Sequence, residues 1–147
     1  MGLLQRIFGL GGQRADEAAS PPQVVARADV DVDGTMVDGV ATCELARSHK
    51  DDLATMLRCC KAEIASSEKT DLVPAPCYFN RAAILYRRAR RYDLEQEILG
   101  RYITCTRAVQ ARARPGSIAD PIANLLEMER RIAKSRALQE RSGRAGA

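Results

Sequence analysis

The stretch that decides the fold runs from Pro76 to Val109 and reads PCYFNRAAILYRRARRYDLEQEILGRYITCTRAV. Apolar residues recur in it at spacings of three and four, which place side chains on one face of an α-helix. The pattern is interrupted at Arg91-Tyr92-Asp93, and this break is short enough for a turn. We therefore predict an antiparallel helical hairpin over residues 76–109, and Pro74 and Pro76 fix where its first helix can begin.

Each predicted helix of this hairpin has an apolar face. In the first helix the face is formed by Phe79, Ala82, Ala83, Tyr86 and Ala89. In the second helix it is formed by Leu94, Ile98, Tyr102, Cys105 and Val109. Asp93 and Gln96 have the spacing of a capping box, which predicts the start of the second helix. The alanines of the first helix permit the two helices to approach closely.

A second pair of helices is predicted before the hairpin. Helical spacing that begins at Val37 predicts a helix to about Ser48. Asp51 or Asp52 is placed to cap the next helix. The apolar stripe of that helix consists of Leu53, Met56, Leu57, Cys60 and Ile64.

The remaining segments predict one more helix and several irregular stretches. Asp120 and Pro121 suit the cap and first position of a last amphipathic helix, which runs to about residue 139. We expect a flexible linker over residues 11–23, an extended lead-in over 24–36, one helical domain over 24–140, and a disordered tail over 141–147. The predicted fold class is all-α: two antiparallel helical hairpins and a C-terminal capping helix, as a short solenoid or bundle, with a flexible N-terminal arm.

The hairpin over residues 76–109 resembles tetratricopeptide-type (TPR-like) repeats. Ala83, Tyr86 and Tyr92 match the small residue, first-helix aromatic and turn aromatic of that pattern. The chain departs from it at three positions, Arg90, Glu95 and Tyr102. The two helix pairs align 41 residues apart, from Ala54 to Glu95, where that repeat has a period of about 34. The resemblance implies a stack of helix pairs that presents a groove to a protein partner.

Charge is distributed unevenly along the chain. The formal net charge is +4, but residues 15–75 carry 12 acidic and 6 basic side chains, whereas residues 76–114 carry 3 acidic and 9 basic ones. The basic hairpin favours an acidic protein partner. The candidate partner-binding residues are Arg87, Arg88, Arg91 and Arg101. The alternative partner is nucleic acid, bound through the basic face of residues 81–114.

Residues 1–10, MGLLQRIFGL, form a short apolar segment that is too short to span a bilayer. On a helix, one face would carry Leu3, Leu4, Ile7 and Phe8. This face is a candidate docking segment for a partner's groove or for peripheral contact with a membrane. The alternative is that it packs against its own domain or frays.

One acidic stretch carries two competing motif resemblances. DVDGTMVD, residues 31–38, resembles the first motif of haloacid-dehalogenase-type phosphatases, which implies a nucleophilic Asp31 and an acid/base Asp33 beside Mg²⁺. The strand and helix alternation of that family does not follow it. The segment from Asp29 also resembles the start of an EF-hand loop, but Val40 occupies the position of the bidentate Glu. A third interpretation is an extended, acidic lead-in closed by an Asp-Gly turn, as in a short hairpin. Whether residues 29–38 bind a cation stays open.

The cysteines do not indicate a site. Five Cys residues form no C-x-x-C pair and are accompanied by one His, which predicts reduced thiols packed in helices and a cytoplasmic location. We expect no cofactor and no metal. The function predicted from the sequence is a non-catalytic helical interaction module or adaptor. Its oligomeric state is not set by any pattern in the sequence.

Overall fold

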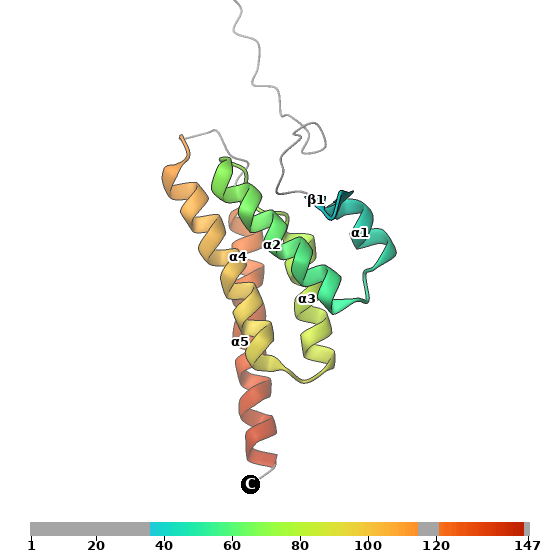
Figure 1. Cartoon of the computed structure of the whole chain (residues 1–147). Helices are drawn as coiled ribbons and strands as arrows, with labels where there is room; N and C mark the ends of the chain where they lie inside the picture. Colours follow the sequence, from blue (N-terminus) through green and yellow to red (C-terminus); the bar gives the residue numbers. More distant parts are fainter. Residues whose placement is uncertain (1–35, 115–120, 146–147) are drawn as a thin grey trace, which may run out of the picture. The chain divides into compact units, whose positions relative to one another are not determined.

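The computed structural model describes residues 36–114 and 121–145, all within one compact unit. The elements in chain order are β1 (Met36–Val37), β2 (Val40–Ala41), α1 (Thr42–Ser48), α2 (Leu53–Lys69), α3 (Pro76–Arg88), α4 (Tyr92–Arg112) and α5 (Ile122–Ala145) (Figure 1). The described part is therefore mostly helical, as predicted. None of its helices is both long and apolar enough to cross a membrane. The predicted segments before residue 36 lie outside the described residues.

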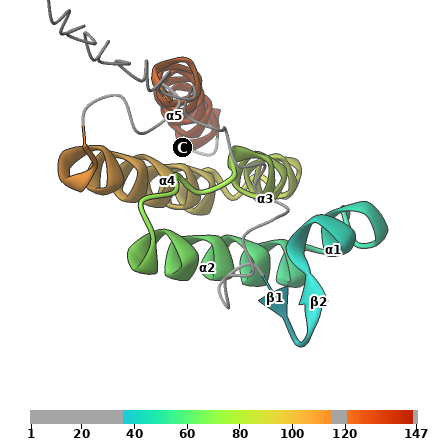
Figure 2. The same ribbon diagram turned by 90° about the horizontal axis from the view of Figure 1, so that it is seen from above.

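The helices of this unit lie in three layers. α3 and α4 form an antiparallel pair, with α2 along one side of the pair and α5 along the other (Figures 1 and 2). α1 and the hairpin of β1 and β2 pack against α2. The α3–α4 pair therefore has two distinct sides, an α2 side and an α5 side.

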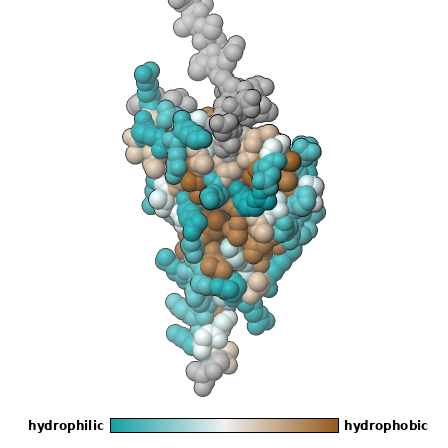
Figure 3. Space-filling model, in the orientation of Figure 1, coloured by the Kyte–Doolittle hydropathy of each residue, from teal (hydrophilic) through white to brown (hydrophobic). Residues whose placement is uncertain are grey.

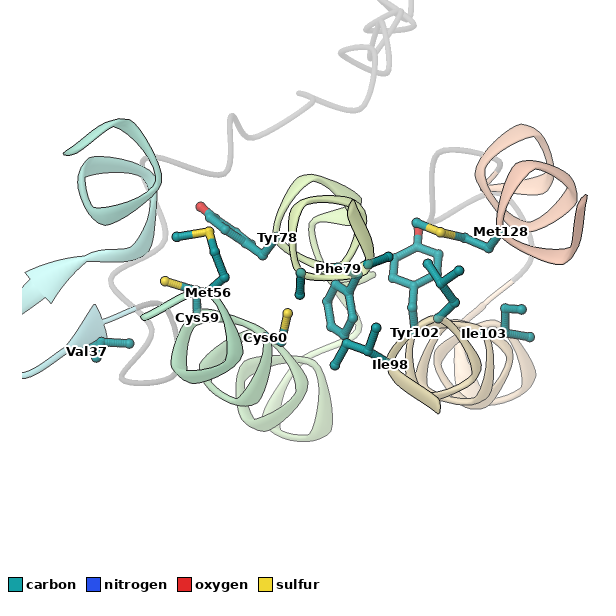
Figure 4. Close-up of a cluster of buried hydrophobic side chains, with 13 residues drawn as sticks. Val37, Met56, Cys59, Cys60, Tyr78, Phe79, Ile98, Tyr102, Ile103 and Met128 are labelled. Atoms are coloured by element: carbon teal, nitrogen blue, oxygen red, sulfur yellow. The ribbon is translucent and has the colours of Figure 1, made fainter. Parts of the chain in front are cut away.

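The apolar core runs through all three layers. Phe79 of α3 and Tyr102 of α4 meet edge to face, with ring centroids 5.2 Å apart and an interplanar angle of 60°. Met128 of α5 reaches the same cluster, and α2 contributes Met56, Cys59 and Cys60 (Figure 4). The small side chains of Ala82 and Ala83 are fully buried, which is consistent with the close approach of α3 to its neighbours.

Two helix starts agree with their sequence signals. Asp52 is the cap of α2, because its side chain accepts a hydrogen bond of 3.1 Å from the backbone N–H of Ala54. Pro76 occupies the first turn of α3, where its missing N–H leaves no helical hydrogen bond unmade.

The predicted start of the first helix was wrong. α1 begins at Thr42, and Val37 and Val40 instead face each other across the two-stranded hairpin. Asp38 and Gly39, with φ of 52° and 76°, form the two-residue turn between them, as an Asp-Gly pair favours. A three-residue spacing suits both a helix face and the two residues that flank such a turn. The periodicity alone therefore did not distinguish them.

The predicted capping box was also wrong. α4 begins at Tyr92, one residue before Asp93, and its cap Arg91 makes no side-chain capping bond. Asp93 instead pairs with Arg91 at 3.2 Å. The turn from α3 occupies residues 89–91, and Arg90 adopts a left-handed φ of 56°.

The predicted disordered tail differs from the structure as well. α5 continues to Ala145, well beyond residue 140. Residues 140–144 lack an apolar period, but Glu and Arg are good helix formers and prolong a helix that has already begun. At the other end, the carbonyl of Pro121 accepts from the N–H of Leu125 at 3.0 Å. The predicted cap, Asp120, lies outside the described residues.

Candidate functional site

An apolar groove lies between α2 and α4. One part has a volume of about 600 Å³ and extends to Tyr86 of α3, and a second part of about 510 Å³ continues toward Arg112. The two parts share Ile64, Glu97 and Arg101, so they form one groove, which we call the α2–α4 groove. Hydrophobic side chains gather in the middle of this face of the molecule (Figure 3).

The floor of the groove comes from the edges of the two helical stripes. On α2, Met56 is buried in the core, whereas Leu57 and Ile64 are half-buried and line the groove. On α4, the half-buried Leu94 and Cys105 do the same. The apolar face of each helix is thus wider than the part of it that the neighbouring helix covers. The surplus apolar surface is left partly open to solvent, which makes the groove a candidate binding surface.

The rim of the groove carries more cations than anions. Its charged residues are Arg58, Lys61, Glu68, Glu97, Arg101 and Arg112. Arg58 forms an ion pair with Asp38 of the hairpin, and Arg101 pairs with Glu97 at 2.6 Å. Lys61 pairs with no carboxylate of the described residues. Arg112 lies 3.4 Å from Asp71, so Lys61 on α2 is the rim cation that an acidic group of an occupant would meet.

The titratable groups on the floor are held in their neutral forms. Burial raises the pKa of Tyr86, and the nearby Glu97 raises it further. Burial also raises the pKa of the Cys60 thiol and of the Cys105 thiol, the latter against the opposing effect of the nearby Arg112 charge. Because a nucleophilic cysteine needs a lowered pKa, these thiols act as apolar lining.

The four arginines predicted as a binding face do not share one surface. Arg101 lies on the groove rim. Arg87 points to the α5 side, where it pairs with the buried Glu95. Arg88 and Arg91 are exposed near the end of α3 and pair with exposed carboxylates.

The wider basic stretch of residues 81–114 is similarly matched with acidic partners. Arg81 pairs with Asp51, and Arg107 pairs with Glu129 at 2.5 Å. Arg112 lies 3.4 Å from Asp71. The cations of this stretch are therefore spread over several surfaces and largely paired. Nucleic-acid binding stays a prediction that none of these contacts favours.

The acidic motif and the N-terminal segment fall mainly outside the described residues. This holds for Asp31 and Asp33 and for the docking residues Leu3, Leu4, Ile7 and Phe8. Within the described ranges, Asp38 lies in the hairpin turn and pairs with Arg58. No cluster of three or more His, Cys, Asp or Glu residues in these ranges is placed to hold a metal ion.

Comparison with protein-family models, curated proteins and solved structures finds no match to this chain. The groove's lining residues Leu57, Ile64, Tyr86 and Leu94 were predicted only to lie on apolar helix faces, because periodicity shows that a face is apolar but not how much of it a neighbour covers. The only sequence signal was the width of the stripes.

Proposed function

We propose that this chain is a non-catalytic protein-interaction module that binds one amphipathic helix of a partner protein in the α2–α4 groove. The observation that carries the proposal is the combination of a half-buried apolar floor with a rim on which Lys61 has no carboxylate partner among the described residues. Grooves of this kind accept helices whose apolar anchors recur at i, i+3, i+4 and i+7. Docking such a helix removes the floor from water, which supplies the main favourable free energy.

The length of the groove sets the length of the partner segment. Its lining spans Leu57 to Glu68 on α2 and Leu94 to Arg112 on α4. At a rise of 1.5 Å per residue these stretches are about 17 and 27 Å long. A partner helix of about 11–18 residues, or three to five turns, matches that length.

The rim sets the chemistry of the partner's polar flank. Lys61 stands on α2, whereas Arg101 of α4 is already paired with Glu97, so acidic side chains on the flank of the docked helix that faces α2 would meet a cation. Exposed ion pairs contribute little affinity, but they orient the helix and speed association. The expected partner segment therefore has Leu, Ile or Met anchors and Asp or Glu beside them.

The resemblance to tetratricopeptide-type repeats belongs to this proposal. Two observations support it. α2 packs on both α3 and α4, and α4 packs on α5, a succession that a stack of helix pairs produces. Arg90 has a left-handed φ at the turn position where the repeat pattern has Gly.

The proposal is tested with synthetic peptides of about 16 residues, the length that the groove fits. One peptide carries apolar anchors at helical spacing with a Glu flank, a second has the same anchors with a Lys flank, and a third is a scrambled version of the first. Fluorescence anisotropy should show the Glu-flanked peptide binding most tightly. Leu57→Asp and Lys61→Glu should each weaken this binding, the first by at least about tenfold.

The control variant is Leu126→Asp, an exposed apolar position on α5 that lies outside the groove. It should leave binding unchanged. Equal loss with Leu126→Asp, or equal affinity for the scrambled peptide, would show that the groove is not the binding site. Tighter binding of a peptide of residues 1–10 would identify the chain's own docking segment as the occupant in place of a partner.

A further inference from the structure

A second cleft lies between α3 and α5, on the side of the α3–α4 pair that faces away from α2. Its volume is about 330 Å³. We call it the α3–α5 cleft, and its lining residues are Ile84, Arg87, Glu127, Arg130, Arg131 and Lys134. It shares none of these residues with the α2–α4 groove, so what it binds is independent of the function proposed above.

At the inner wall of this cleft, two guanidinium groups share one buried carboxylate. Glu95 of α4 has no exposed surface. Arg87 Nε donates to Glu95 Oε2 at 3.0 Å, and Arg87 Nη2 lies 2.6 Å from Oε1 as an ion pair outside hydrogen-bonding geometry. Arg131 Nη2 lies 3.9 Å from the same Oε1, and Arg131 Nη1 donates to Asn80 Oδ1 at 2.6 Å.

This arrangement leaves positive charge at a half-buried wall. The side chains of Arg87 and Arg131 are only 26% and 16% exposed. The pKa of Arg131 is lowered overall, chiefly by burial. The nearby Glu95 opposes this effect, and the neighbouring Arg87 adds to it. One carboxylate neutralises one guanidinium, so a second anion would relieve the remaining charge.

The outer rim adds to this excess. Arg130 pairs with Glu127 at 2.9 Å, and Lys134 has no ion-pair partner among the described carboxylates. Around the cleft, four cationic side chains therefore face two carboxylates, Glu95 and Glu127. Two positive charges are left unmatched.

We propose that the α3–α5 cleft binds the phosphate group of a phosphate monoester, either a free small molecule or a phosphorylated side chain. A phosphate monoester carries about −1.5 to −2 charges at pH 7, which matches the excess, whereas a carboxylate neutralises only one charge. Guanidinium forks and an ammonium group are the donors that phosphate oxygens prefer. Glu95 and Asn80 already hold the two arginines in place, so binding orders few further side chains.

The test is an NMR titration of the full chain with inorganic phosphate and with O-phosphoserine, each compared with chloride at the same ionic strength. Saturable shifts are expected at the side-chain N–H groups of Arg87 and Arg131. Lys134→Met should weaken phosphate binding about tenfold, the loss of one charge-assisted hydrogen bond. Lys134 is exposed, so this variant leaves the core intact. Lys50→Met, an exposed lysine outside the cleft, should not weaken binding.

The two ligands distinguish the sources of the phosphate. Tighter binding of O-phosphoserine indicates a phosphorylated side chain or another ester, and equal binding indicates the free anion. Three outcomes overturn the proposal: chloride causes the same shifts, the titrations do not saturate, or Lys134→Met and Lys50→Met lose affinity equally. None of these outcomes bears on the α2–α4 groove.

Discussion

The two sides of the α3–α4 pair solve the same packing problem in different ways. On the α2 side, apolar side chains meet with a groove left open beside them, the ion pairs along that groove are exposed, and the buried carboxylate of Glu63 accepts hydrogen bonds from Thr42 and from the backbone N–H of Ala75. On the α5 side, the buried charge of Glu95 is held between two arginines from different helices. The contrast teaches that α2 is held by burial of apolar surface and by hydrogen bonds from uncharged donors to Glu63, whereas α5 is positioned by ion pairs from two arginines to one buried carboxylate.

The most severe test of this comparison is Glu95→Ala. Removing the carboxylate leaves Arg87 and Arg131 half-buried without their counterion. We expect a loss of about 3 kcal/mol in the free energy of unfolding, the lower end of the range for broken buried pairs, because Arg87 stays 26% exposed. Urea denaturation followed by circular dichroism measures it. A loss below about 1 kcal/mol would mean that ion pairing does not position α5.

A smaller effect is expected from Tyr78→Phe on the α2 side. The hydroxyl of Tyr78 donates to Thr42 Oγ1 at 3.1 Å, and Thr42 donates to Glu63 Oε1 at 3.3 Å, which links α3 to α1 and α2. Losing one such bond should cost about 1 kcal/mol at pH 7. Urea denaturation at a series of pH values provides the measurement.

This difference should shrink in alkali. Burial raises the pKa of Tyr78 from 10.0 to about 12, so the phenol's contribution is complete below pH 10 and is lost as the pH rises toward 12. The Phe variant has no phenol to titrate. Thr42→Val is the control for the alkaline loss, since it removes the hydrogen bonds of Thr42 to Tyr78 and to Glu63 but keeps the phenol. A gap between wild type and Tyr78→Phe that stays constant up to pH 12 would contradict this account.

The turn that joins α3 to α4 lies on neither the α2 side nor the α5 side alone. Relieving strain in this turn should therefore stabilise the α3–α4 pair without favouring either side. Arg90 has φ of 56°, a conformation that Gly adopts without a steric penalty. Arg90→Gly should raise the free energy of unfolding by about 0.5–1 kcal/mol. This gain is the steric penalty of a left-handed φ, which Gly removes, minus the conformational entropy that Gly adds to the unfolded chain. Thermal unfolding measures it. Ala89→Gly, one position earlier at φ of −80°, should instead destabilise the protein, and a gain there would rule out relief of strain as the cause.

The smallest effect is expected at the groove rim. Glu97 pairs with Arg101 four residues later on α4, and both side chains are more than half exposed. Glu97→Gln should change the free energy of unfolding by less than about 0.5 kcal/mol, as for other exposed pairs. Because Glu97 lies two residues after Glu95 on the same helix, it also provides the matched control for Glu95→Ala. A loss as large as that of Glu95→Ala would abolish the distinction between the two sides.

The fold was largely predictable where local signals agreed with packing. The stripe of α2, its cap at Asp52 and the start of α3 at Pro76 each rest on a nearby residue that suits one conformation. Prediction failed where one spacing suited two structures, as at Val37 and Val40. It also failed for the end of α5, whose last residues carry no apolar pattern.

The candidate sites were less predictable than the fold. Of the four predicted arginines, only Arg101 lies on the α2–α4 groove, and Arg87 lies in the α3–α5 cleft. Helical spacing places a side chain on a face of its own helix, but which neighbouring helix covers that face depends on contacts between distant segments. Arg131 illustrates this, because its approach to Glu95 joins residues of two different helices.

The sequence by itself determined that this chain forms amphipathic helices, that two of them form a hairpin near residues 76–109, and that this hairpin is basic. Those properties follow from side-chain order along each helix, since periodicity, caps and prolines act locally. Only the tertiary structure decided which apolar residues stay open as a groove and which arginines share a carboxylate. Both depend on how completely one helix covers another, and that is fixed by the packing of all the helices together.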